Sequence, residues 1–248
     1  MPDYSCVYLG DNARTPYGSH SQDVIYKFTA QGVERLFEED ADLVVLACNT
    51  SSSGALRRLQ REFLPEHFHD KKVLGIIIPT AEIAAVMTKS KEIGILATEA
   101  TVDSIVYEKE IKKLDAGIKV YQQACPLLVP IIEAGDSEWR ELDLIVEKYV
   151  NQLFKKGENM DTLILGCTHY ELIRDIIKKY VPDSVNILNQ GTIVAKKLEN
   201  YLERHPEISG RLEKSGERTF LSTEDSPKIK NLFRKFYGKE TNLRKVIL

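Results

Sequence analysis

Two cysteines in this chain stand in nearly the same local sequence. Cys48 ends the segment DLVVLAC, and Cys167 ends the segment DTLILGC. Each segment predicts a short apolar β-strand, then a very small residue and the thiol, with a helical pattern to follow. A thiol at a helix N-terminus can have its pKa lowered by the helix dipole and the free backbone N–H groups. A single buried cysteine is usually a small apolar residue, but the repeated pattern favours two functional thiols.

A pair of equivalent thiols restricts the chemistry. A nucleophilic cysteine usually needs a partner base, and a tyrosine-phosphatase loop needs an arginine six residues after the cysteine, where this chain has Gly54 and Ile173. Thiols that face each other across a cleft can remove a proton from one face of a carbon and return one to the other face. That reaction inverts a stereocentre, so the pair indicates a racemase with a pseudosymmetric site.

The elements that would position these thiols alternate between strand and helix. Apolar runs predict strands near residues 4–9, 43–47, 73–78, 93–97, 118–121, 163–165, 185–188 and 219–221. Helical patterns lie between them, near residues 22–39, 81–88, 138–154, 172–180, 192–202 and 227–236. This alternation is typical of an α/β fold with parallel sheets.

We expect two pseudosymmetric, mainly parallel-sheet α/β domains with the active site in the cleft between them. The first domain would comprise residues 1–79 plus 189–248, and the second residues 80–188. The strand at 43–47 has no alternating polar positions, so it should be central and covered on both faces. Pro79 should end the strand at 73–78. In the loop after the first strand, Gly18 should permit a positive φ.

Composition and charge exclude several classes of protein. A net charge of −3 gives no basic excess for nucleic acid, and no apolar run approaches the ~18 residues that span a membrane. The cysteines at 6, 48, 125 and 167 lack the spacing of a zinc site, and reduced thiols indicate a cytoplasmic protein. Cys6 and Cys125 are expected to be structural, and His67 and His69, which precede a strand, to lie outside the site.

Four motifs in order resemble one enzyme family. They are PYG (residues 16–18), ACNTSSS (47–53), ACPLLVP (124–130) and GCTHY (166–170), with FLSTEDSPKIKNLF (220–233) near the end. Together they closely resemble the glutamate racemases of the aspartate/glutamate racemase superfamily, over nearly the whole chain. The resemblance implies interconversion of L- and D-glutamate without a cofactor or metal, to supply D-glutamate for peptidoglycan, by an enzyme that is often a homodimer.

The same resemblance assigns roles to residues. It implies that Cys48 deprotonates D-glutamate and that Cys167 deprotonates L-glutamate, with His169 beside Cys167 to assist proton transfer. The implied substrate-binding residues are Tyr17, Gly18, Asn49, Thr50 and Thr168.

One part of the family pattern is not present near Met1. The resemblance implies an apolar strand followed by an Asp-Ser-Gly-x-Gly-Gly turn that contacts the substrate. We therefore expect either a start upstream of Met1 or a protein without that strand. Loss of the strand would leave apolar surface and unpaired backbone beside the strands at 4–9 and 43–47.

Two alternatives stay open. One is a racemase-like protein that binds an acidic amino acid or a protein partner with weak or no turnover. The other is an aspartate racemase, although the pair Thr168–His169 resembles glutamate racemases, since aspartate racemases tend to carry Thr-Glu there.

Overall fold

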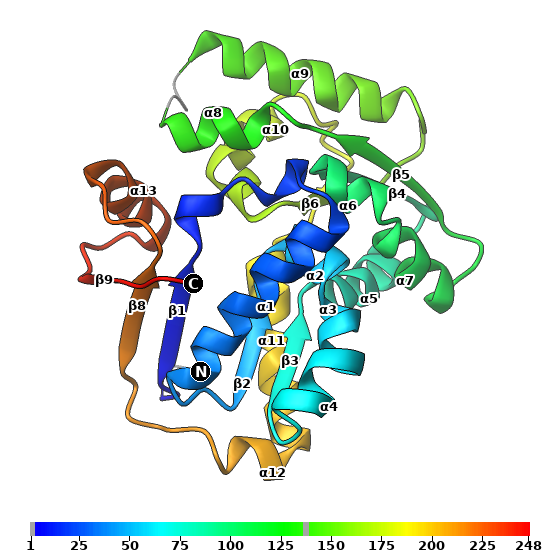
Figure 1. Cartoon of the computed structure of the whole chain (residues 1–248). Helices are drawn as coiled ribbons and strands as arrows, with labels where there is room; N and C mark the ends of the chain where they lie inside the picture. Colours follow the sequence, from blue (N-terminus) through cyan, green and yellow to red (C-terminus); the bar gives the residue numbers. More distant parts are fainter. Residues whose placement is uncertain (1–2, 136–138) are drawn as a thin grey trace.

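The computed structural model describes residues 3–135 and 139–248. All paired strands in these ranges run parallel and lie in three sheets (Figure 1). One sheet has the order β1 (Cys6–Gly10), β8 (Arg218–Ser222) and β9 (Leu243–Lys245), and a second pairs β2 (Leu43–Leu46) with β3 (Lys72–Gly75). The third has the order β5 (Lys119–Ala124), β4 (Glu92–Ala97), β6 (Thr162–Gly166) and β7 (Asn186–Ile187).

Helices connect these strands, as the alternating pattern predicts. The longer ones are α1 (Gln22–Glu38), α5 (Ile77–Met87), α7 (Val106–Leu114), α9 (Arg140–Phe154), α11 (Gln190–Arg204) and α13 (Pro227–Tyr237). The shorter ones are α2 (Asn49–Gly54), α3 (Leu56–Arg58), α4 (Leu64–His67), α6 (Glu99–Asp103), α8 (Leu128–Ala134), α10 (Arg174–Lys178) and α12 (Pro206–Ser209). Short helices of other types are η1 (Asn12–Arg14), η2 (Tyr17–Ser19), η3 (Leu59–Phe63) and η4 (Thr168–Ile173). The expected helix start at Glu138 lies outside the described residues.

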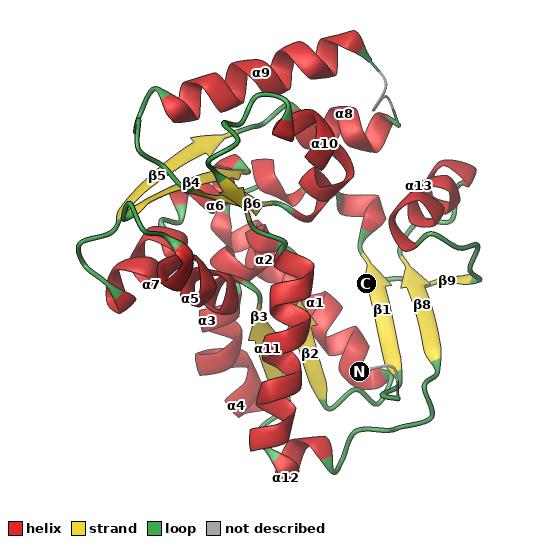
Figure 2. Ribbon diagram, turned by 180° about the vertical axis from the view of Figure 1, so that it is seen from behind, coloured by secondary structure: helices red, strands yellow, loops and turns green. Residues whose placement is uncertain are grey.

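The two cysteine-bearing strands lie in different halves of the molecule. In Figures 1 and 2 the sheet of β4–β7 forms the upper half, and the other two sheets form the lower half. The upper sheet is covered on both faces, because separate apolar clusters pack between it and α9 on one side and α5 and α7 on the other. Every residue of β4 and β6 is buried. The mainly parallel, two-part α/β architecture is thus confirmed, whereas the domain boundaries stay a prediction.

The strand β2 differs from its expected place. Its apolar sequence indicated a central strand, yet within the described residues it pairs only with β3, and its side chains alternate between half-buried and buried. An all-apolar strand usually has neighbours on both sides. The prediction of a central strand is therefore wrong for the described chain, because the edge of β2 that faces β1 has no strand beside it (Figure 2).

Pro79 also acts differently from the prediction. The strand β3 ends at Gly75, and Pro79 lies in the first turn of α5. Proline is tolerated there because the first N–H groups of a helix have no intrahelical partner. Among the described residues, no helix is both long enough and apolar enough to cross a membrane.

Candidate active site

Cys48 follows β2 and caps the next helix. It is the N-cap residue of α2, where its Sγ accepts a hydrogen bond from the Ser51 N–H at 3.5 Å. Burial raises the pKa of this thiol, and the bonds from Ser51 and Thr50 only reduce the effect. The expected lowering by the helix terminus is therefore wrong for Cys48, because the loss of solvation outweighs the backbone dipoles.

Cys167 follows β6 in the other half of the molecule and is 9% exposed. It begins the 3₁₀-helix η4, and its side chain makes no capping bond. Instead its Sγ lies 3.8 Å from Nδ1 of His169. The two thiols thus occupy equivalent strand ends but have different partners, a backbone N–H for Cys48 and an imidazole for Cys167.

His169 is held from its other side by Glu133, a residue of α8. The Nε2 of His169 lies 2.7 Å from Oε1 of Glu133, and the two side chains are 19% and 16% exposed. Burial opposes the charged imidazolium, but the contacts with Cys167 and Glu133 prevail and raise the pKa of His169 to about 10.

Both thiols line a single cavity of about 1010 Å³ between the two halves. They are close enough that the charge of Cys167 contributes to the raised pKa of Cys48. The predicted residues Tyr17, Gly18, Asn49, Thr50, Thr168 and His169 line the same cavity. Thr168 is exposed to it, and Asn49 and Thr50 are buried in its wall. The structure therefore brings together every residue that the sequence indicated, in a cleft where two thiols can flank one small molecule.

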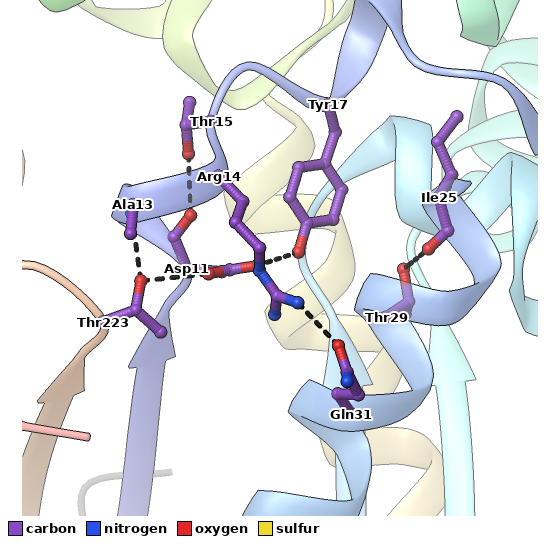
Figure 3. Close-up of polar contacts among 9 residues, drawn as sticks. All are labelled: Asp11, Ala13, Arg14, Thr15, Tyr17, Ile25, Thr29, Gln31 and Thr223. Atoms are coloured by element: carbon purple, nitrogen blue, oxygen red, sulfur yellow. Dashed lines mark hydrogen bonds and ion pairs between the residues drawn. The ribbon is translucent and has the colours of Figure 1, made fainter. Parts of the chain in front are cut away.

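Tyr17 is positioned by Asp11, at the end of β1 (Figure 3). The Tyr17 hydroxyl donates to Oδ2 of Asp11, and the Nε of Arg14 donates to the same oxygen at 2.6 Å. Thr223, which follows β8, donates to the other carboxylate oxygen at 2.9 Å. Burial and the Asp11 carboxylate raise the pKa of Tyr17 well above its ordinary value, so its hydroxyl keeps its proton. Asp11 was not predicted from the sequence to be a site residue.

Gly18 lets the loop approach the other half closely. A Cβ at this position would lie 2.5 Å from Cβ and 2.7 Å from Cγ2 of Thr98. Gly18 is not among the glycines of positive φ, which are Gly135, Gly216 and Gly238 in the described ranges. The expected role in a left-handed conformation is therefore wrong, and the residue is needed because a side chain does not fit against Thr98.

Asn49 and Thr50 join the two halves through buried polar networks. The Nδ2 of Asn49 donates to Gln190 at 2.8 Å, and its Oδ1 accepts from the Tyr107 hydroxyl at 2.7 Å. The Thr50 hydroxyl lies 2.9 Å from that of Thr98. The side-chain amide of Asn49 is therefore committed to protein partners.

Glu133, Gln190 and Tyr107 are site residues that the sequence did not indicate. None of the three lies within a named motif, although Glu133 stands three residues after ACPLLVP, and Gln190 is 141 positions from Asn49 in the chain. Four residues were expected to lie outside the chemistry, and of these Cys6 also lines the large cavity. Cys6 is exposed and Cys125 is 1% exposed, while His67 and His69 lie in and after α4 and do not line the cavity.

Comparison with known proteins gives a consistent result. The family model for Asp/Glu/Hydantoin racemase matches residues 1–198. Glutamate racemase of Roseobacter denitrificans is 38% identical over 95% of this chain and 88% of its own length. The corresponding enzyme of Persephonella marina is 36% identical over 100% of this chain and 89% of its own.

Solved structures with the same fold are also glutamate racemases. The RacE1 isoform from Bacillus anthracis superimposes with a TM-score of 0.89 at 31% identity, covering 100% of this chain and 90% of its own. The enzyme from Francisella tularensis, in complex with D-glutamate, has a TM-score of 0.86 at 29% identity and covers 100% and 89%. Sequence, fold and the paired thiols agree, and the chain belongs to the Asp/Glu/Hydantoin racemase family.

Proposed function

We propose that this amino-acid racemase interconverts L-glutamate and D-glutamate without a cofactor, with Cys48 and Cys167 as the acid/base groups. The observation that carries the proposal is that thiols from opposite halves of the molecule line one cavity. Glutamate is supported as the substrate by relatives named glutamate racemase at 38% identity and by a solved relative that holds D-glutamate.

The two thiol environments suggest how a cycle begins. Burial raises the pKa of Cys48 and favours its protonated form, and the imidazolium of His169 lies 3.8 Å from Sγ of Cys167. The Cys167 thiolate would take the Cα proton of L-glutamate, with the electron pair left on carbon. Cys48 would then give its proton to the opposite face, which forms D-glutamate. From D-glutamate the same steps run in reverse, with Cys48 as the base.

The remaining predicted residues would hold the substrate between the thiols. Helix N-termini carry free N–H groups that bind carboxylates, and the backbone N–H groups of Asn49, Thr50 and Thr168 stand directly after the two cysteines. Tyr17 and Gly18 would shape the same pocket from the η2 loop. We assign Asn49 a backbone contact because its side-chain amide already bonds Gln190 and Tyr107.

The wider biological role belongs to the same proposal. D-glutamate would supply peptidoglycan synthesis, in the cytoplasm where the four unpaired cysteines would stay reduced. A homodimer is the expected assembly.

A second candidate is binding of an acidic amino acid without turnover. It is favoured by the raised pKa of Cys48, because a thiol that stays protonated is a poor base for the proton on carbon.

Exchange of the Cα proton in D₂O separates the two candidates. The NMR signal of the Cα proton should disappear from both enantiomers of glutamate. Cys48→Ser and Cys167→Ser should each slow racemisation about a hundredfold or more, while Cys6→Ser, at an exposed thiol, should not. Folded protein that binds glutamate but exchanges neither enantiomer would exclude racemisation. Faster exchange of aspartate would change the substrate assignment.

A further inference from the structure

Asn49 directly follows Cys48, and its side chain belongs to a buried polar cluster. The other members are Thr80 of α5, Tyr107 of α7 and Gln190 of α11, and we call these four residues the amide cluster. Each of the four is at most 9% exposed. A buried polar group without a partner is costly, so the four side chains depend on one another.

Both ends of the Asn49 amide are held within the cluster. The Tyr107 hydroxyl donates to Oδ1 of Asn49 at 2.7 Å, and Nδ2 of Asn49 donates to Oε1 of Gln190 at 2.8 Å. Nε2 of Gln190 lies 2.8 Å from the Tyr107 oxygen and 2.9 Å from Oγ1 of Thr80. Burial raises the pKa of Tyr107, so its hydroxyl keeps the proton that it donates. The Asn49 amide therefore cannot rotate without breaking bonds at both ends.

The amide cluster lies where the chain passes between the two halves. Thr80 is near the start of α5, which comes after β3 of the lower half and packs against the upper sheet. Gln190 is the first residue of α11, which comes after β7 of the upper sheet and runs down along the lower half (Figure 2). The bond between Gln190 and Thr80 thus joins the two crossing segments.

Tyr107 connects the amide cluster to the second thiol. Its ring is fully buried in the apolar cluster that contains Ile95 of β4 and Ile164 of β6. Cys167 directly follows β6. Because a close-packed core leaves its side chains little room to shift, the Tyr107 hydroxyl has a fixed position relative to Cys167.

Cys48 itself is held weakly. Its Sγ accepts a hydrogen bond from the Ser51 N–H at 3.5 Å, and sulfur is a weak acceptor. The hydroxyl of Thr50 contacts that of Thr98 in the upper half at 2.9 Å, but Thr50 is one residue further from the thiol than Asn49. The peptide that joins Cys48 to Asn49 is therefore oriented mainly by the Asn49 amide.

We propose that Tyr107 and Gln190 are positioning residues for proton transfer by Cys48, a role that rests on racemisation as the proposed function. They hold Asn49, and through it the Cys48 thiol, where Sγ can reach the Cα of a substrate opposite Cys167. A path of packed and hydrogen-bonded groups runs from Cys167 through β6 and Tyr107 to Asn49 and Cys48. The separation of the two thiols is thereby set by the amide cluster.

Tyr107→Phe tests this role because it removes one bond to Asn49 and keeps the ring. A displacement of about 1 Å can slow a reaction about a hundredfold, so kcat/KM for glutamate should fall about tenfold or more. The fall should be equal for the two enantiomers, because an enzyme cannot change the equilibrium between them.

Isotope effects identify the thiol whose step becomes slower. Glutamate with deuterium at Cα would lose it to Cys48 as the D-enantiomer and to Cys167 as the L-enantiomer. If only the Cys48 step slows, cleavage of the C–D bond limits the reaction of D-glutamate more strongly. For L-glutamate, cleavage at Cys167 becomes reversible before Cys48 delivers its proton, and the isotope effect falls. The ratio of the isotope effects on kcat/KM, D over L, should therefore rise in Tyr107→Phe.

Tyr149→Phe is the matched control. Tyr149 is a buried tyrosine of α9 in the upper half and lies outside the amide cluster. The variant loses the same hydroxyl group and should keep the wild-type ratio of isotope effects. A general loss of stability would reduce the amount of folded enzyme, which circular dichroism measures, without changing that ratio.

Alkylation tests the position of Cys48 without any turnover. Iodoacetamide and mass spectrometry give the rates of Cys48 and Cys167 in one sample. Release of Asn49 should let Cys48 leave its buried place, so the ratio of the Cys48 rate to the Cys167 rate should rise about threefold or more in Tyr107→Phe. The same ratio should stay at its wild-type value in Tyr149→Phe.

Gln190→Met provides a second variant, because methionine is similar in length to glutamine and lacks the amide. It should shift the isotope and alkylation ratios in the same direction as Tyr107→Phe. The double variant should shift them less than the sum of the two single effects, because both residues act through Asn49.

Unchanged ratios in Tyr107→Phe and Gln190→Met would overturn the positioning role, as would an equal shift in Tyr149→Phe. A wild-type protein that racemises no glutamate would instead refute the proposed function. The alkylation rates alone would then decide whether the amide cluster positions Cys48.

Discussion

His169 lies between a carboxylate and a thiol, with Nε2 2.7 Å from Oε1 of Glu133 and Nδ1 3.8 Å from Sγ of Cys167. The contact with the imidazole distinguishes Cys167 from Cys48, because the Sγ of Cys48 instead accepts a hydrogen bond from the backbone N–H of Ser51. Glu133 and Cys167 together make the charged imidazolium the favoured form, even though the side chain is largely buried.

Glu133→Gln should therefore change how stability depends on pH. The folded pKa of His169, about 10, is above its unfolded value of about 6.5. The imidazolium thus contributes stability that is fully present below about pH 6.5 and is lost as the pH rises through about 10. Glu133→Gln removes the negative charge and should flatten this decline, as urea unfolding at a series of pH values would measure.

The matched control for this variant is Glu171→Gln, which removes a half-exposed carboxylate that pairs with Arg174 instead. NMR titration of the His169 ring should give a lower midpoint in Glu133→Gln and an unchanged one in Glu171→Gln. An unchanged midpoint in both variants would show that Glu133 does not set the charge of His169.

Cys48 should be slow to react with alkylating agents at neutral pH. Burial raises the pKa of its thiol, so a smaller fraction of Cys48 than of an exposed cysteine is present as the reactive thiolate. With iodoacetamide, mass spectrometry should show Cys48 modified at least about tenfold more slowly than exposed Cys6 at pH 7.5. The Cys48 rate should still be rising at pH values where the rate of a small model thiol, with its pKa of about 8.5, has reached its plateau. Parallel pH profiles would contradict the raised pKa.

The sequence predicts the cysteine pair because both thiols follow a local pattern that repeats. An apolar strand, a small residue and a cysteine specify Cys48 and Cys167 without knowledge of the tertiary fold, and β6 is buried at every residue as expected. The α/β class follows from the alternation of strands and helices for the same reason.

Residues that act through tertiary contacts could not be found in this way. Glu133 reaches His169 from a helix 36 positions earlier in the chain, and Gln190 reaches Asn49 across 141 positions. The central position predicted for β2 was wrong. Its apolar residues indicate that neighbouring atoms bury the strand, but they do not specify whether those atoms belong to another strand or to helices.

Gln190→Ala should destabilise the contact between the two halves. The Gln190 amide bonds Asn49, Tyr107 and Thr80, all buried. A buried polar group without its partner costs about 1–3 kcal/mol, so loss of this hub should lower the free energy of unfolding by about 2–5 kcal/mol. Urea unfolding would measure the change.

Gln152→Ala is the control for that variant, because Gln152 is an exposed residue of α9. Its effect should stay within about 0.5 kcal/mol. A similarly small effect for Gln190→Ala would mean that water replaces the lost bonds and that the network does not join the halves energetically.

Gly18→Ala should push the η2 loop away from α6. The added Cβ would lie 2.5 Å from Cβ of Thr98, closer than real contacts allow. Thr98 is 7% exposed and caps α6 through the Thr101 N–H at 3.4 Å, so it has little freedom to move. We expect a loss of about 1–3 kcal/mol in the free energy of unfolding and a raised KM for glutamate. Gly191→Ala is the control, because its Cβ would meet only an ordinary contact at 3.7 Å.

A second substitution at Thr98 tests whether that contact is the cause. Thr98→Ala keeps the Cβ that collides with the new side chain, so it should not rescue Gly18→Ala. Thr98→Gly removes that Cβ, so in this background the added penalty of Gly18→Ala should largely disappear; both Thr98 variants lose the hydroxyl contact with Thr50, and that loss is common to the comparison. A double-mutant cycle measures the coupling between the two positions. If Gly18→Ala lowers the free energy of unfolding equally in the Thr98→Ala and Thr98→Gly backgrounds, the loss arises from the backbone of the loop and not from its contact with α6.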